Sequence, residues 1–218
     1  GGLMGALNGA LIHCTGINFF VLTLASGGML RGISLMITDG KPITKFGKAF
    51  MQLGIGRIGE FQFPVLFALT LILLSSPLMF HVKWGNYVQA LGGSETALKR
   101  SGVRTGFYRI SVHVFLGITA AVTAVIITAR LNSAEPNAGM NMELDAITAV
   151  IMGGTPIRGG NASIAGTVLA VLILGIIRNG LTLLSVSSDF QQWVTGFLLL
   201  ASVLISEIRV WNTRALIK

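Results

Sequence analysis

Few side chains in this sequence have the types and spacing that catalysis or metal binding needs. The single cysteine, Cys14, can form no internal disulfide, and together with the adjacent His13 it lacks metal-ligand spacing. No G-x-x-x-x-G-K-[ST] motif occurs, so the chain has no loop of its own to cradle the phosphates of ATP. The sequence therefore predicts no catalytic residue, no metal site and no resident cofactor.

Residues 54–59 read GIGRIG and match the G-x-G-x-x-G pattern of dinucleotide-binding loops. That pattern binds a dinucleotide only after a strand and at the start of a helix, with an acidic residue about 20 positions later. Here the apolar run FQFPVLFALTLILL follows. We interpret the stretch as a glycine-rich hinge before an apolar segment.

Charged side chains within apolar runs are the remaining candidates for chemistry. Arg31 lies well inside such a run and needs a partner or a water-filled path. Arg178 lies nearer the end of its run, so we expect it to snorkel to the surface. Glu143 and Asp145 are the only carboxylates placed to bind a coupling proton or sodium ion.

The elements that must position these side chains are membrane helices. Of 218 residues, 52% are hydrophobic and only 11% are charged, against roughly 25% charged in soluble domains. Runs of about 20 apolar residues, enough to span a bilayer, occupy residues 17–37, 61–82, 107–129, 164–184 and 190–208. The predicted fold class is all-α, a polytopic membrane helix bundle that forms one domain over residues 1–218.

Two apolar segments, residues 1–12 and 144–152, are too short to cross a bilayer alone. The first has neither an initiator Met nor the basic region of a signal peptide, which predicts a start in mid-protein. The second precedes the run GGTPIRGGNAS, which predicts a half-spanning helix that ends in a glycine-rich loop. Its candidate residues are Glu143, Asp145, Gly153, Gly154 and Thr155. Irregular backbone at membrane depth is typical of permeation routes, and a short amphipathic helix on the membrane surface is the alternative.

Small residues recur at helical spacing and predict close helix packing. Gly1, Gly5 and Gly9 are four residues apart, and Ser26, Gly27, Gly28 and Gly32 crowd the next span. Small side chains let backbones approach within lipid, where no hydrophobic force drives helices together. Polar side chains within the spans predict a translocation path that is lined by Asn18, Thr23, Ser26, Arg31 and Asn179.

The net charge of +8 does not predict a nucleic-acid partner, because the basic residues lie between hydrophobic spans. They resemble the flanking charges of membrane helices, which are enriched on the cytoplasmic side. The loop 83–109 and the tail, with Arg209, Arg214 and Lys218, are therefore predicted to be cytoplasmic. The connection 39–60 on the opposite side also holds basic residues, namely Lys41, Lys45, Lys48 and Arg57, so the charge rule supports this orientation only weakly.

Residues 90–110, ALGGSETALKRSGVRTGFYRI, form the most polar stretch and predict a short capped helix. Ser94 suits the N-cap, Glu95 the first turn, Lys99 the last turn, and Gly102 the end of the helix. Two turns are marginal in water, so we infer that a partner holds this helix. A solvated loop is the alternative. Trp84, Tyr87 and Tyr108 bracket the stretch as an interfacial belt.

Three blocks of this sequence carry a resemblance to known proteins: ALGGSETALKRSG, ELDAITAVIMGGTPIRGGNASIAGT and LGIIRNGLTLLSVSSDFQQWVTG. They resemble, in this order, the blocks ALGGNE-x-A-x-x-SG, ELDAIAAVVLGGTSLAGG-x-G-x-x-GT and LG-x-x-NNGL-x-LLGVSS-x-x-Q of the permease subunits of ribose-type sugar ABC importers. Order and spacing agree over nearly the whole chain. Arg178 stands where the family has the first Asn of NNGL, and Pro156 with Arg158 alters the glycine-rich loop. Family members begin with further membrane segments, so the resemblance implies a partial chain.

The resemblance implies a multi-pass subunit of the bacterial inner membrane that imports a monosaccharide or related small polar solute. Its expected partners are a second permease subunit, cytoplasmic ATP-binding subunits that use ATP and Mg, a periplasmic sugar-binding protein, and membrane lipids. By analogy, the residues that couple to the ATPase are Gly92, Gly93, Ser94, Glu95, Ala97, Leu98, Lys99, Arg100, Ser101 and Gly102. An ATP-independent carrier or channel, or an inactive structural fragment, is the alternative.

Overall fold

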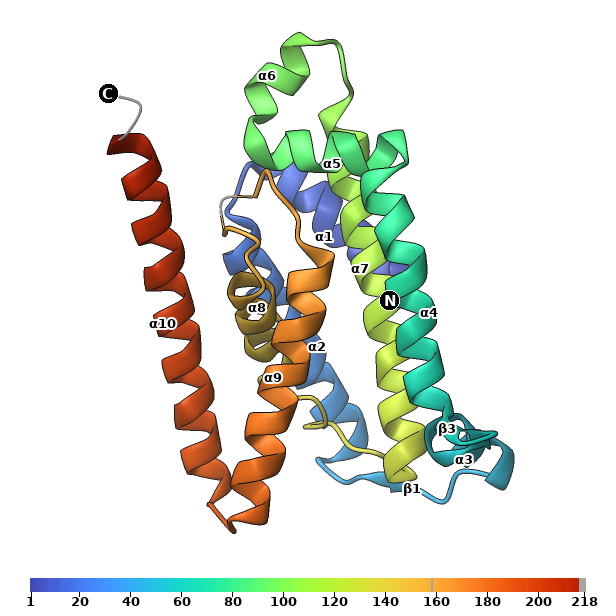
Figure 1. Cartoon of the computed structure of the whole chain (residues 1–218). Coiled ribbons are helices and arrows are strands. Elements are labelled where there is room, and N and C mark those ends of the chain that lie inside the picture. Colours follow the sequence, from blue (N-terminus) through green and yellow to red (C-terminus); the bar gives the residue numbers. More distant parts are fainter. Residues whose placement is uncertain (158, 216–218) are drawn as a thin grey trace. The chain divides into compact units, whose positions relative to one another are not determined.

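A computed structural model describes residues 1–157 and 159–215 as helices joined by short loops, with two minimal pairs of strands (Figure 1). Arg158 and Lys218, both singled out in the sequence, lie outside the described residues. The all-α fold class is confirmed. The chain divides into two compact units, unit 1 with Gly1–Val88 and Thr96–Gly139, and unit 2 with Gln89–Glu95 and Met140–Lys218.

Four helices are long and apolar enough to cross a membrane within the part of the chain that the structure describes. They are α2 (Phe19–Thr38), α4 (Phe63–Phe80), α7 (Thr105–Leu131) and α9 (Ile164–Leu183). They confirm the predicted spans 17–37, 61–82, 107–129 and 164–184. The predicted span 190–208 lies inside the longer α10 (Ser188–Ala215).

The membrane helices expose long apolar side chains. Met36 is 73% exposed, Leu73 72% and Ile176 71%. A soluble protein rarely leaves so many large apolar groups in contact with water. Lipid or other subunits therefore have to cover these faces, as expected of a membrane helix bundle.

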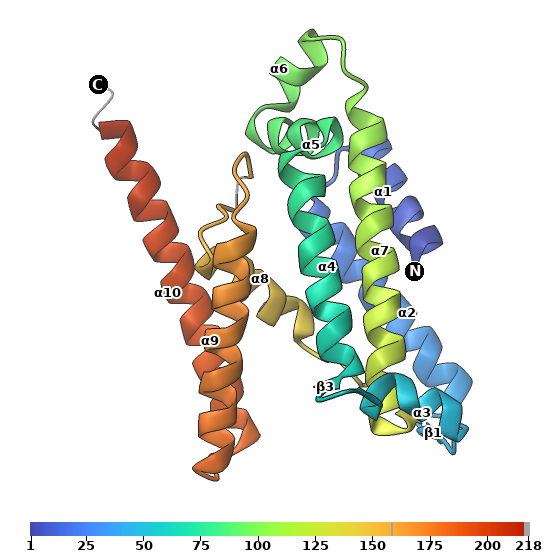
Figure 2. The ribbon, with the colours of Figure 1, turned by 45° about the vertical axis from the view of Figure 1, so that its right-hand side comes forward.

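In unit 1, α1 (Gly2–Thr15) lies against α7, and α4 runs beside α7 (Figures 1 and 2). Gly5 and Gly9 are buried, and a Cβ on Gly9 would lie 2.9 Å from Ile110 Cα. The close packing predicted from the first glycine repeat is therefore confirmed. By contrast, a Cβ on Gly27, Gly28 or Gly32 would meet no described atom within 4 Å.

A short helix and one strand pair lie at the end of α7 in unit 1, and a second strand pair precedes α4. The helix α3 (Lys48–Ile55) packs on α7 through Gly54, where a Cβ would collide with the α7 backbone. Strand β1 (Ile43–Thr44) pairs antiparallel with β4 (Ser133–Ala134), and β2 (Arg57–Ile58) with β3 (Phe61–Gln62). GIGRIG thus lies at a helix end and in a hairpin, which is not the strand–turn–helix context of a dinucleotide site.

In unit 2, α9 and α10 meet at a tight turn and diverge from it, while α8 (Met142–Met152) packs against both (Figure 2). Thr148, Ala149 and Ile151 are buried at these contacts. Gly153, which follows α8, packs on the first turn of α9, since a Cβ there would lie 2.6 Å from the carbonyl carbon of Gly166. The second short apolar segment is therefore a short helix, as predicted.

Candidate translocation and coupling site

The predicted coupling helix is present as α6 (Glu95–Arg100), between α4 and α7 in the chain. Gly102 adopts the left-handed conformation with φ 79°, and its N–H donates to the Lys99 carbonyl oxygen at 3.0 Å. The Val103 N–H donates to the Leu98 carbonyl oxygen at 3.4 Å. These two bonds are those of a glycine-terminated helix, so the predicted end at Gly102 is confirmed.

The predicted apolar stripe of α6 is only partly covered. Leu98 is buried at 8% exposure, whereas Ala97 and Ser101 are exposed. The Ser101 hydroxyl donates to the Ala97 carbonyl oxygen at 3.1 Å. Some of the docking that so short a helix needs therefore comes from this chain through Leu98.

A second helix in this connection, α5 (Lys83–Gly93), was missed by the sequence analysis, which treated residues 83–93 as loop. Its start is tied to α7 by aromatic side chains of the predicted interfacial belt. The Trp84 indole N–H donates to the Ser111 hydroxyl at 2.9 Å, and the rings of Tyr87 and Tyr108 lie 5.1 Å apart. The apolar spacing of Trp84, Tyr87, Val88 and Leu91 is the helical signal that could have revealed α5.

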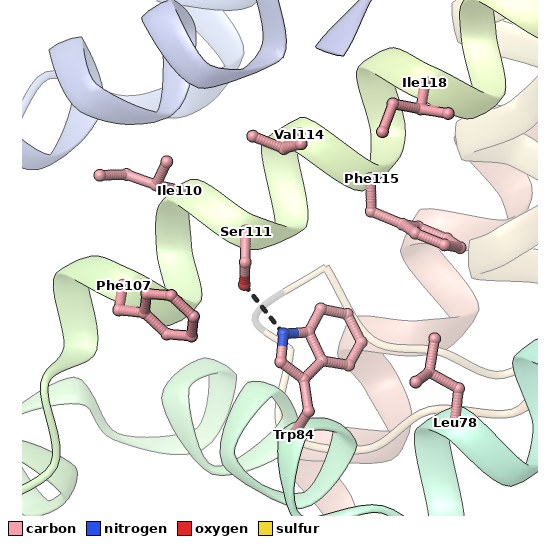
Figure 3. A pocket seen from close by; sticks show the side chains of 8 residues that line it. All are labelled: Leu78, Trp84, Phe107, Ile110, Ser111, Val114, Phe115 and Ile118. Carbon is pink, nitrogen blue, oxygen red and sulfur yellow. Dashed lines mark hydrogen bonds between the residues drawn. The ribbon is translucent and has the colours of Figure 1, made fainter. Parts of the chain in front are cut away.

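A cavity of 480 Å³ opens between α4, the start of α5 and α7 (Figure 3). The Trp84 N–H points across it to Ser111, and the other lining groups are apolar. The lining residues are Leu78, Trp84, Phe107, Ile110, Ser111, Val114, Phe115 and Ile118. A sugar needs many hydrogen-bonding partners, so we do not assign this cavity to the solute path.

The glycine-rich loop after α8 is held by hydrogen bonds between its two ends. Gly154 has a positive φ of 93°, and the Thr155 hydroxyl accepts the N–H of Ser163 at 3.1 Å. Ser163 then caps α9 by accepting the N–H of Gly166 at 3.2 Å. The described residues thus show the predicted helix followed by a non-helical loop, whose two ends are joined by a hydrogen bond.

Gly92, in the last turn of α5, lies against the backbone of this loop within unit 2. A Cβ on Gly92 would come within 2.7 Å of the Gly160 nitrogen and 3.2 Å of Gly159 Cα. A Cβ on Gly93 would be 3.8 Å from Gly160 Cα. Gly92, the first residue predicted to couple to the ATPase, therefore lies against the loop that leads into α9, a contact that sequence reasoning did not predict.

Arg178 does not merely snorkel, contrary to the sequence-based expectation. Its Nη2 donates to Asp145 Oδ1 at 2.6 Å and to the Thr195 hydroxyl at 3.3 Å. The two predicted carboxylates differ as a result, because Asp145 is paired with α9 while Glu143 is exposed. A charged network therefore joins α8, α9 and α10.

Four of the five predicted path residues lie on or next to α2, and Asn179 lies on α9 in unit 2. Asn18 caps α2 by accepting the Phe20 N–H at 2.9 Å. Thr23 and Ser26 donate to carbonyl oxygens of their own helix. Arg31 is half-buried and has no hydrogen bond or ion pair with any described residue. These contacts leave the path assignment a prediction, with Arg31 the most demanding of its members.

Comparisons with known proteins also match transport permeases. The family model described as branched-chain amino acid transport system / permease component matches residues 1–203. The Escherichia coli K12 ribose import permease protein is 37% identical over 209 residues, which cover 94% of this chain and 65% of the relative. No solved structure matches the chain.

Two further relatives from the same organism carry other sugars in their names. The D-allose transport system permease protein is 36% identical over 208 residues, which are 95% of this chain and 64% of the relative. The L-arabinose transport system permease protein is 30% identical over 203 residues, which are 93% and 62%. The chain thus spans less than two thirds of the length of these relatives.

Proposed function

Because the chain belongs to the family of branched-chain amino acid transport permease components, we propose that it is the membrane-spanning part of an ABC importer. Its cargo would be a monosaccharide or a related small polar solute, since its relatives are named for ribose, allose and arabinose. The description of the family names amino acids. We nevertheless favour a sugar as the cargo, because the relatives that are named for sugars match at least 93% of this chain.

The observation that carries the proposal is the path of the chain through α5 and α6. It passes from unit 1 to unit 2 between Val88 and Gln89 and returns between Glu95 and Thr96. The segment that contains α5 and α6 is therefore connected along the chain to both units. Within unit 2, Gly92 touches the glycine-rich loop that leads into α9. A short helix at this point of the chain suits a role in coupling a separate ATP-hydrolysing subunit to the membrane helices.

The energy source would lie in partner subunits. The sequence has no phosphate-binding loop of its own, so ATP and Mg would be bound by cytoplasmic ATP-binding subunits that dock on α6. A second permease subunit would complete the path, and a periplasmic binding protein would deliver the solute at the bacterial inner membrane. Ala97 and Ser101, exposed on α6, are the side chains that we expect to contact the ATPase.

The Gly92 contact gives a direct test. Gly92→Ala places a methyl group against the Gly160 nitrogen, so α5 has to move away from the glycine-rich loop. We expect ATP hydrolysis to continue while uptake per ATP falls severalfold. Both rates would be measured for the assembled importer in proteoliposomes that contain its binding protein.

Gly175→Ala in α9 is the matched control, because a Cβ there meets no described atom within 4 Å. It makes the same chemical change in a helix interior of the same unit. Equal uptake per ATP in the two variants would contradict the proposed role of the Gly92 contact in coupling. Uptake by the unchanged protein without any ATP-hydrolysing subunit would overturn the importer proposal itself.

An ATP-independent carrier is less favoured by the charged residues. Such a carrier needs a carboxylate that can bind and release a coupling ion. Asp145, the better placed of the two candidates, is already neutralised by Arg178 at 2.6 Å.

A further inference from the structure

Polar side chains connect the three helices of unit 2 close to the turn between α9 and α10. Arg178 of α9 donates to Asp145 of α8 and to Thr195 of α10. Gln191 of α10 donates to the Thr182 hydroxyl at 3.3 Å, and Thr182 donates back to the Arg178 carbonyl oxygen at 2.9 Å. Five polar side chains thus form one hydrogen-bonded network.

Arg178 and Thr182 of this network lie within α9, which is long and apolar enough to cross a membrane. Arg178 is five residues before the end of α9 and Thr195 is seven residues after the start of α10. At about 1.5 Å per residue, these positions are roughly 7 to 10 Å from the helix ends. Ionisable groups within membrane-spanning helices are costly and generally serve the transport of a polar species.

The ion pair is open rather than enclosed. The Arg178 side chain is 46% exposed and the Asp145 side chain 23% exposed. The exposure leaves both groups within reach of a solute.

The donors and acceptors that remain match a polyhydroxylated solute. Both bonds of Arg178 to described residues use Nη2, and a guanidinium carries five N–H donors, so Nη1 and Nε can bind other groups. Asp145 uses Oδ1 in the pair and keeps its second carboxylate oxygen as an acceptor. Neighbouring hydroxyl groups of a sugar need donors and acceptors side by side. The pair has no net charge, which favours a neutral solute over an anion or a cation.

We propose that Arg178, Asp145 and Thr195 form a solute-contact site of the translocation path that hydrogen-bonds the hydroxyl groups of a neutral monosaccharide or polyol. The proposal rests on the importer function proposed above. Arg178 replaces the Asn that the resembling family has in its NNGL block, so this site distinguishes the chain from that pattern.

The kinetic test uses Arg178→Asn, which restores the residue of the resembling pattern and should therefore fold. Uptake of D-ribose, D-allose and L-arabinose would be measured in proteoliposomes with the ATPase and the binding protein. We expect kcat/KM for the transported sugar to fall about tenfold, the worth of a charge-assisted hydrogen bond. Discrimination against the corresponding deoxy sugar should shrink. A structural tie between helices would not alter that discrimination.

Thr195→Val and Thr123→Val form a matched pair of variants. Both threonines donate to a carbonyl oxygen of their own helix, but only Thr195 also accepts from Arg178. We expect Thr195→Val to weaken discrimination against the deoxy sugar and Thr123→Val to leave it unchanged. The double variant Arg178→Gln with Asp145→Asn removes both charges at once, so it avoids leaving either charge unpaired.

Labelling gives a second readout in a Cys14→Ser background. Thr195→Cys should react with a water-soluble thiol reagent, and the transported sugar should slow that reaction; Thr123→Cys should show no such protection. Unchanged kcat/KM and deoxy-sugar discrimination in Arg178→Asn, or no protection of Thr195→Cys, would overturn the site. Absence of ATP-dependent uptake in the unchanged protein would instead count against the importer function.

Discussion

The first two helices of the chain carry glycines at helical spacing, but only the first uses them within this chain. In α1, a Cβ on Gly5 would collide with the His113 carbonyl oxygen of α7. In α2, a Cβ on Gly28 would meet no described atom within 4 Å. The same sequence pattern thus accompanies a close helix contact in one case and an open face in the other. Small residues permit close approach, but they do not specify which helix approaches.

The largest expected effect comes from filling the contact between α1 and α7. Gly5→Leu places a side chain where the α7 backbone lies, with Val114 Cα at 3.0 Å from the added Cβ. Since backbone cannot move aside as a side chain does, we expect a loss of about 3 kcal/mol or more in stability. Thermal unfolding of the detergent-solubilised protein would measure it.

Gly28→Leu on α2 is the control for this variant. It adds the same side chain to a helix position with open space, and leucine favours the helix over glycine, so we expect the unfolding temperature to rise slightly rather than fall. Equal destabilisation by the two variants would abolish the contrast between α1 and α2.

Local signals in the sequence predicted most of the membrane helices. The spans follow from about 20 consecutive apolar residues, and the end of α6 follows from Gly102, which adopts φ 79°. These features depend on neighbouring residues only. The short α5 was missed because Lys83, Asn86 and Gln89 made its segment look like a polar loop, although its apolar residues recur at helical spacing.

The contacts between the residues of the candidate site could not be predicted from neighbouring residues in the sequence. Asp145 and Arg178 are 33 residues apart in the chain, and Gly92 meets Gly160 from still farther away. Such pairings depend on how three or more helices pack. From the sequence, each charge could be recognised as costly in a membrane, but its partner could not be named.

The open face of α2 also contains a charge, which α1 lacks, and removing that charge should separate insertion from transport. Arg31 has no partner among the described residues. Arg31→Leu should therefore make insertion of α2 more favourable by about 2.5 kcal/mol, the cost of Arg near a helix centre. Insertion of the α2 segment into microsomes, scored by glycosylation of flanking sites, measures this change.

If Arg31 lines the solute path, sugar uptake should fall in the same variant although the protein inserts better. Uptake that rises together with insertion would place Arg31 outside the path.

The smallest expected effect has opposite signs on the two helices. Gly9→Ala puts a methyl group 2.9 Å from Ile110 Cα, so α1 must shift and stability should fall by about 1 to 2 kcal/mol. Gly28→Ala meets nothing, and alanine favours the helix over glycine by about 0.5 to 1 kcal/mol, so stability should rise. The unfolding temperatures of the two variants, measured on the isolated subunit and on the assembled importer, distinguish these signs. A gain for Gly28→Ala in the isolated subunit that becomes a loss in the assembly would mean that another subunit packs on the α2 glycines. A gain in stability both in the isolated subunit and in the assembly would indicate that lipid covers this face of α2.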